Sequence, residues 1–258
     1  RDLVRSRGLG DVYKRQDVSP DVKAEYLFSD SYVLYLHALG GRELNDYRRL
    51  NAFSPYWSLN ARMPSTYVPL NATLGFKASP VNGLWFNIFG GYRISKDELF
   101  CNLVDADGYY FTHFLQDKAK TAYGGAELKY GYKDWFDASL KGTFYSWKTD
   151  NENEELYLMT KPKFELNFYA EAKVFEGLKV YLGYEYVQRK EYVIEEGNSS
   201  RDFGLGNISN LSVGASYTFL KDLSVFGRVN NLLNKQYYYE YGYPAEKLNV
   251  LAGLSLVF

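Results

Sequence analysis

The sequence is poor in the residues from which metal centres and catalytic sites are most often built. Its 258 residues include one cysteine, Cys101, so neither an internal disulfide nor a cysteine-rich metal site can form. The two histidines, His37 and His113, leave little material for a zinc site or for histidine-based catalysis. We therefore expect a chain without enzymatic activity, metal or cofactor.

Long hydrophobic runs and an excess of positive charge are missing as well. No run of roughly 18 apolar residues occurs, and the mean hydropathy is −0.37, which excludes a protein that crosses a membrane with helices. The net charge of −1 argues against a nucleic-acid partner. By contrast, 26 Tyr, 17 Phe and 22 Gly, beside only 2 Met and 7 Pro, indicate an all-β fold.

The first sixteen residues differ from the rest of the chain. They are rich in basic residues and contain no apolar core, so they are not a signal peptide. The part from Arg7 to Gln16 resembles a translated sequencing adapter. We therefore assign residues 1–16 to a non-native segment and 17–258 to a partial barrel, and we expect the chain to be the C-terminal piece of a longer protein.

Apolar and polar residues alternate along much of the chain, which is the pattern of β-strands with two different faces. The clearest runs are 68–78, 163–174 and 250–258. About eleven strands are predicted in this way. They span 22–28, 32–40, 67–78, 84–96, 122–132, 136–147, 163–174, 178–189, 208–219, 223–233 and 248–258.

Short and long connections alternate between these strands. The long connections fall near 41–66, 97–121, 148–162, 190–207 and 234–247. A three-residue turn at 133–135 pairs Tyr132 with Phe136, which sets Glu127 opposite Lys141 on the polar face. The equivalent turn at 175–177 places Lys173 opposite Lys179, which is an unfavourable pair.

Soluble β-sandwiches also alternate apolar and polar residues. Short turns at one end and long loops at the other are typical of an antiparallel transmembrane β-barrel, with an apolar face toward lipid and a polar lumen. Aromatic residues on the apolar faces form one band near the short turns and another near the long loops, as membrane surfaces favour. They are Phe28, Tyr32, Tyr132, Phe136, Phe219 and Phe258 in the first band, and Tyr92, Phe144 and Tyr186 in the second.

The last part of the chain is the most specific. The segment Asn231-Leu232-Leu233-Asn234-Lys235-Gln236-Tyr237, followed by Gly242-Tyr243-Pro244 and a strand that ends in Phe258, resembles the C-terminal end of TonB-dependent outer-membrane receptors. The family often has Gly-Arg before the last strand, where this chain has Ala245-Glu246-Lys247-Leu248. Upstream, Ser79-Pro80 and Gly90-Gly91-Tyr92-Arg93 are similar to receptor barrels of Bacteroidetes-type bacteria.

The resemblance implies a 22-stranded barrel in the outer membrane of a Gram-negative bacterium, of which this chain would hold about half. It implies a plug domain and a TonB-contacting segment upstream, and an assembly signal at Phe258 that the barrel-assembly machinery recognises. The expected function is TonB-dependent uptake of a scarce nutrient such as an iron chelate, a corrinoid, a glycan or a peptide. The alternative is an outer-membrane binding or adhesion barrel without active transport.

Aromatic and basic residues in the long loops are the candidates for a ligand-binding rim, because rings and a few polar groups suit recognition at a barrel mouth. They are Arg42, Tyr56, Trp57, Arg62, Tyr109, Tyr110, Phe111, Tyr237, Tyr238 and Tyr241. A third hypothesis, a barrel hydrolase, would use His37, with Glu43 and Asp46 close behind it in sequence, or His113. A histidine of the lumen wall or rim without a catalytic role is the favoured interpretation.

Overall fold

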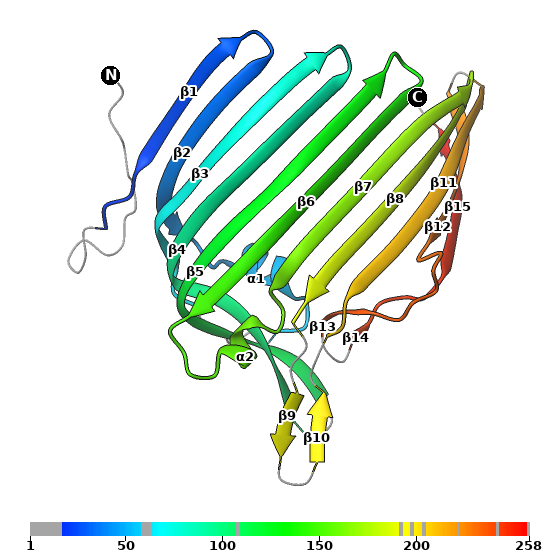
Figure 1. Ribbon diagram of the computed structural model, residues 1–258. Coiled ribbons are helices and arrows are strands. Elements are labelled where there is room, and N and C mark those ends of the chain that lie inside the picture. The colour runs from blue at the N-terminus through cyan, green and yellow to red at the C-terminus, as the bar shows by residue number, and fades with distance from the viewer. Residues whose placement is uncertain are drawn as a thin grey trace.

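Eleven antiparallel strands form one continuous sheet in the computed structural model, and each strand pairs with the next along the sheet (Figure 1). The structure describes residues 17–57, 63–106, 109–190, 193–196, 199–202, 205–220, 222–240 and 243–256. The segment 1–16, assigned above to a non-native origin, lies outside these residues. Within the described residues, β1 and β15 form the two edges of the sheet.

The strands of the sheet match the eleven that the alternation predicts. They are β1 Asp21–Ser29, β2 Tyr32–Glu43, β3 Thr66–Val81, β4 Leu84–Ala106, β5 Tyr109–Tyr132, β6 Phe136–Thr149, β7 Pro162–Phe175, β8 Leu178–Arg189, β11 Ile208–Leu220, β12 Leu223–Asn230 and β15 Asn249–Leu256. In their described residues, the connections at the long-loop end carry two short helices and two small hairpins. These are α1 Tyr47–Phe53, α2 Glu154–Leu158, β9 Val193–Glu196 with β10 Ser199–Asp202, and β13 Tyr238–Glu240 with β14 Tyr243–Pro244.

The predicted registers are confirmed. Tyr132 pairs with Phe136, and Glu127 lies opposite Lys141. Lys173 and Lys179 also face each other, and the structure shows what relieves their repulsion. The Lys179 Nζ donates to Glu171 Oε1 at 2.8 Å, so the second lysine is held by a carboxylate on the neighbouring strand.

Two predicted boundaries are wrong. Residues 97–121 were expected to form a long loop, but β4 runs on to Ala106 and β5 begins at Tyr109, so the two strands continue as one long hairpin. The strand expected over 223–233 ends at Asn230, because Asn231 adopts a left-handed backbone with φ of 48°. Side-chain alternation weakens in both places, so the sequence pattern alone does not locate these ends.

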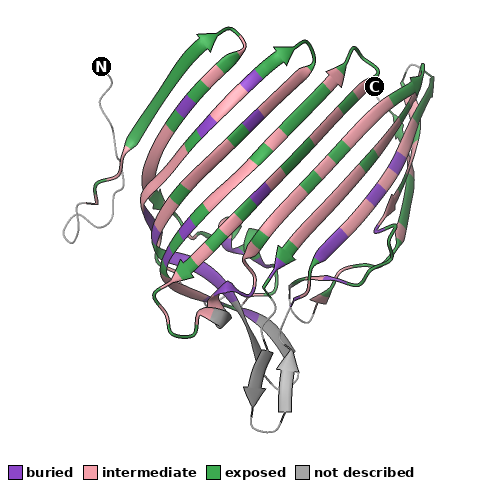
Figure 2. Ribbon diagram, in the orientation of Figure 1, coloured by how far each residue is buried: buried purple, intermediate pink, exposed green. Residues whose placement is uncertain are grey.

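The two faces of the sheet differ in chemistry. Polar side chains of β7, β8, β11 and β12 line a concavity of about 630 Å³, among them Asn167, Glu171, Glu185 and Arg228. Exposed and less exposed residues alternate along many of the strands (Figure 2). The exposed positions of the opposite face carry large apolar side chains. Examples are Leu74, Ile88, Leu128, Leu140, Phe144, Leu182, Val250 and Leu254. The concave face is therefore polar and the convex face is apolar.

Tyrosine rings cover glycines on the polar face. A Cβ atom at Gly75 would lie 2.3 Å from the ring of Tyr35, and a Cβ atom at Gly91 would lie 2.3 Å from the ring of Tyr123. Both phenols bond across the wall, since Tyr35 donates to Asn87 at 3.1 Å and Tyr123 donates to Asn71 at 2.9 Å. Part of the tyrosine content thus packs flat against the polar face of the sheet.

Neither α1 nor α2 is long and apolar enough to cross a membrane, nor is any other helix in the described part of the chain.

A new charge should lower the stability of the protein at one position of β7 and have little effect at the adjacent position. Leu166 lies between Gly142 and Tyr186 on the apolar face, whereas Asn167 lines the polar concavity. Leu166→Arg should lower the free energy of unfolding by about 2–4 kcal/mol, because it places a charge at lipid depth, and Asn167→Arg should change it little. Refolding titrations in lipid vesicles measure both values. Equal losses at the two positions would contradict the assignment of the faces.

Candidate functional site

The long β4–β5 hairpin carries most of the packing at the long-loop end. Residues 99, 100 and 101 alternate in direction along β4, so the hairpin presents two faces. On one face, Leu50 of α1 packs against Leu99, Cys101 and Phe114. On the other face, the buried residues Leu158 and Met159, at the end of α2, pack against Phe100 and Ala119. These two small cores fix the loops relative to the sheet.

A bulge in β4 places an acidic side chain inside this region. The register shifts between Ser95 and Glu98, and Asp97 takes a left-handed φ of 55°. Thr66 Oγ1 and Gln116 Nε2 both donate to the carbonyl of Asp97, at 2.8 and 2.9 Å. The irregular backbone is therefore held by side chains of β3 and β5.

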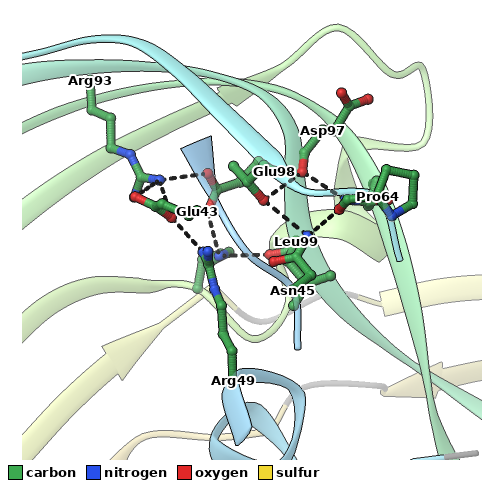
Figure 3. A network of polar contacts seen from close by, with 11 residues as sticks. Glu43, Asn45, Arg49, Pro64, Arg93, Asp97, Glu98 and Leu99 are labelled. Carbon is green, nitrogen blue, oxygen red and sulfur yellow. Dashed lines mark hydrogen bonds and ion pairs between the residues drawn. The ribbon is translucent and has the colours of Figure 1, made fainter. Parts of the chain in front are cut away.

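Glu98 forms the centre of an ion-pair cluster at the bulge (Figure 3). Its side chain is only 3% exposed, with Oε2 3.2 Å from Arg93 Nη2 and Oε1 3.7 Å from Lys161 Nζ. Arg93 also contacts both carboxylate oxygens of Glu43 at 3.1 Å, and Arg49 of α1 reaches the same carboxylate at 2.6 Å. The cluster links β2, α1, β4 and the entrance to β7.

Lys161 is an unusually placed member of this cluster. Its ammonium group lies 4.9 Å from the ring centre of Phe100, 4.8 Å from that of Trp147 and 5.7 Å from that of Phe53, and it donates to the Leu99 carbonyl at 3.1 Å. Burial lowers the pKa of Lys161 below its usual value, while the nearby Glu98 carboxylate opposes this shift. The rings and the carboxylate together hold a largely buried cation.

Beside this cluster, a cavity of about 570 Å³ opens between the α1 connection, the ends of β7 and β8, and the last connection. Its lining includes Phe53, Tyr56, Glu165, Glu185, Arg189, Tyr239 and Tyr243. We call it the mouth cavity. A second cavity of about 310 Å³ lies next to it and shares Phe53, Thr160, Pro162 and Tyr239.

The mouth cavity joins the first and last long connections of the sheet. The ring of Tyr56 stacks on the ring of Tyr243 with a centroid distance of 3.6 Å and an interplanar angle of 1°. Tyr239 donates to Glu185 Oε2 at 2.9 Å, and both burial and this carboxylate raise the pKa of Tyr239 above its usual value. Glu185 also lines the polar concavity of the sheet, so the mouth cavity continues into the lumen wall.

The residues predicted for a ligand rim fall into separate environments. Tyr56 lines the mouth cavity. Arg42 bonds to Asp17 and Ser65 at the end of β2, and Trp57 packs between Tyr47 and Phe114. Tyr237 is only 5% exposed and lies beside the ring of Tyr239. Tyr238 accepts at its carbonyl from Arg189 and at its hydroxyl from Gln236.

The remaining predicted residues are not described in full. Tyr109, Tyr110 and Phe111 pair with β4 in the long hairpin, and their side chains lie outside the described parts. Arg62, Tyr241 and the terminal Phe258 lie outside the described residues altogether. His37 lies on the polar face, with Nε2 3.7 Å from Glu25 Oε1 and its ring beside Tyr35. This placement agrees with a histidine of the lumen wall.

The sequence interpretation missed the carboxylates of the mouth cavity. Glu165 and Glu185 are both on the polar face of predicted strands and close to their long-loop ends, so parity and position together could have singled them out. Tyr243 stands in the recognised C-terminal segment without being named as a candidate. Lys161 and Glu98 gave no signal, because a loop lysine and a glutamate in an expected loop normally face solvent.

The recognised C-terminal segment has a structural role. Asn231 is 1% exposed, and its side chain donates to the carbonyls of Lys235 and Glu246 at 2.7 and 3.1 Å. Its Oδ1 accepts from the Lys235 amide, and Asn234 Oδ1 accepts from the Leu248 amide, both at 3.2 Å. Both asparagines have φ near 50°, a conformation that asparagine tolerates well. They fasten the last connection to the sheet.

Comparison with solved structures identifies the architecture. The chain superposes on FpvA of Pseudomonas aeruginosa, solved with bound pyoverdine, with a TM-score of 0.65 and 17% identity over 91% of this chain and 32% of that one. It superposes on the ferric-catecholate import receptor Fiu of E. coli K12 with a TM-score of 0.61 and 14% identity, over 92% and 34% of the two chains. For the copper transporter OprC the values are 0.60 and 13%, over 92% and 39%.

The fold is therefore that of the β-barrel wall of TonB-dependent outer-membrane receptors. The chain spans about a third of the length of the solved structures that it matches. No protein-family model matches the sequence. No curated protein matches it either.

The ion-pair cluster predicts that substitutions of Glu98 and Lys161 have strongly coupled effects on stability. Glu98→Gln leaves Lys161 buried without its carboxylate and should destabilise the β4–β5 hairpin by about 3–5 kcal/mol. Adding Lys161→Met removes the stranded charge and should restore much of that loss, since the methionine can pack among the three rings. Limited proteolysis of the hairpin measures the local opening. If the two single effects simply add in the double variant, the two groups are not coupled.

Proposed function

We propose that this chain belongs to an outer-membrane receptor that takes up a scarce nutrient with energy from TonB. The single observation that carries the proposal is the mouth cavity, because it is bordered by the long connections and continues through Glu185 into a polar barrel wall. A binding site at one end of a polar passage is what an import receptor requires. The solved structures that share this fold are described as receptors for iron complexes and as a copper transporter.

The proposed mechanism has three steps. The ligand first enters the mouth cavity between Tyr56 and the last connection. A plug domain, which the family resemblance implies, then rearranges on the periplasmic side when TonB acts on it. The ligand finally moves along the lumen face, where paired charges such as Glu171 with Lys179 keep the wall wet.

The proposed function also implies what contacts the apolar convex face and what recognises the C-terminal strand. Outer-membrane lipid would cover the exposed apolar side chains, since a patch of this size does not remain in water. The C-terminal strand with Phe258 would be recognised by the barrel-assembly machinery. Deleting Phe258 should then reduce the amount of protein in the outer membrane, which fractionation and immunoblotting measure, and normal insertion of the truncated protein would argue against this signal.

Genetic interaction with TonB tests the proposed function without knowledge of the ligand. In the source bacterium, loss of the gene should impair growth under one limitation among iron, copper, corrinoid, glycan and peptide supply. In cells that already lack TonB, loss of the gene should cause no further growth defect, because both losses block the same import step. Competitive growth of the single and double mutants measures this. A defect of the same size in both backgrounds would instead indicate a binding or adhesion barrel without active transport.

A further inference from the structure

Two carboxylates of the mouth cavity lie close together on neighbouring strands. Glu165 of β7 pairs in register with Val187 of β8, so Glu185 stands two residues along β8 on the same face. Diagonal neighbours of this kind are about 7–8 Å apart at the backbone, and long side chains in such positions reach one another. Both side chains line the mouth cavity.

Neither carboxylate has a cationic partner among the described residues. Glu165 Oε2 accepts from the hydroxyl of Tyr145 at 3.0 Å, and Glu185 Oε2 accepts from the hydroxyl of Tyr239 at 2.9 Å. These neutral donors orient one oxygen of each group and leave both negative charges in place. Elsewhere on the polar face, by contrast, Glu171 and Glu127 are each within 3 Å of a lysine nitrogen.

The positive groups nearby are already engaged. Arg189 is the basic side chain among the described residues that line the mouth cavity, and its Nη1 donates to the carbonyl of Tyr238 at 2.8 Å. Lys161, in the adjoining cavity, is held by Glu98 and by the Leu99 carbonyl. An anionic ligand would therefore meet two carboxylates and few available donors.

Aromatic rings complete the lining. Phe53, Tyr56, Tyr239 and Tyr243 all border the cavity, and Tyr56 and Tyr243 present a stacked pair at its edge. Ring faces attract cations, most strongly where water is excluded. Carboxylates and ring faces together form a surface that complements an organic cation better than a neutral or anionic molecule.

We propose that the mouth cavity binds a ligand through a protonated amine or a related organic cation, held between Glu165 and Glu185 and against the rings of Tyr56 and Tyr243. The proposal rests on the proposed receptor function, because it names the ligand class of the same cavity. A bound cation would remove the repulsion between the two carboxylates. Because Glu185 also borders the lumen-wall concavity, it would be the first group to receive the cation on its way inward.

Binding of a matched pair of small probes tests this inference. The probes are tyramine, which carries a ring and an ammonium group, and N-acetyltyramine, which keeps the ring but is neutral. The full-length gene product is purified in detergent and titrated with each probe by calorimetry. We expect tyramine to bind at least about tenfold more tightly than N-acetyltyramine, which is the contribution of a charge-assisted contact. Its affinity should fall as salt is added, whereas that of the neutral probe should not.

Isosteric variants locate the effect. Glu165→Gln and Glu185→Gln keep the acceptor for the neighbouring tyrosine hydroxyl and should each weaken tyramine binding about tenfold. Glu176→Gln is the matched control, since Glu176 is exposed in the short turn between β7 and β8. It makes the same change of charge and should leave the affinity unchanged. Heat-modified migration on gels confirms that each variant is folded.

Two results would overturn the inference. One is equal binding of the two probes, or no binding of either, by the folded protein. The other is full tyramine affinity in both glutamine variants. Either result beside a TonB-dependent growth phenotype refutes the cation site and leaves the receptor function intact. Glutamate-dependent tyramine binding beside a TonB-independent phenotype refutes the receptor function and leaves the cation site intact.

Discussion

The structure depends on one constraint, which is that successive side chains of a strand point to opposite faces while the backbone pairs with its neighbours. Each of the eleven strands therefore contributes to a polar concave face and an apolar convex face at once. A slip of one residue would exchange Leu166 and Asn167, so the registers are strongly specified. The three-residue turn at 133–135 and the bulged turns before Leu178 and Leu223 set these registers from the short-turn end.

At the long-loop end, a bulge in β4 interrupts the regular alternation of side chains. The bulge at Asp97 turns Glu98 into a buried position between Arg93 and Lys161, and the β4–β5 hairpin then extends between two small cores. Breaking such a buried ion pair is costly, so the cluster fixes the positions of α1 and of the entrance to β7. The mouth cavity owes its shape to these fixed connections and to the Asn231 turn, which fastens the opposite side.

Much of the fold could be predicted from the sequence, because period-two alternation and turn length are local properties. The eleven strands and the Glu127–Lys141 register follow from them and are confirmed. The length of the β4–β5 hairpin and the burial of Lys161 could not be predicted, since both depend on contacts between segments distant in sequence. The aromatic content was also only partly explained, because the rings of Tyr35 and Tyr123 cover glycines of the lumen wall. Of the candidate rim residues, Tyr56 reaches the mouth cavity, while the carboxylates opposite it were missed.

A nitroxide scan along β7 tests the separation of lipid from lumen most directly. Single cysteines at positions 164–172, in a protein whose Cys101 is replaced by alanine, are spin-labelled in lipid vesicles. Collision with oxygen, which concentrates in lipid, should peak at the even positions, which include Leu166 and Phe168. Collision with a water-soluble nickel complex should peak at the odd positions, which include Glu165 and Asn167. Profiles that rise and fall together, or that lack a period of two, would contradict a barrel wall with these two faces.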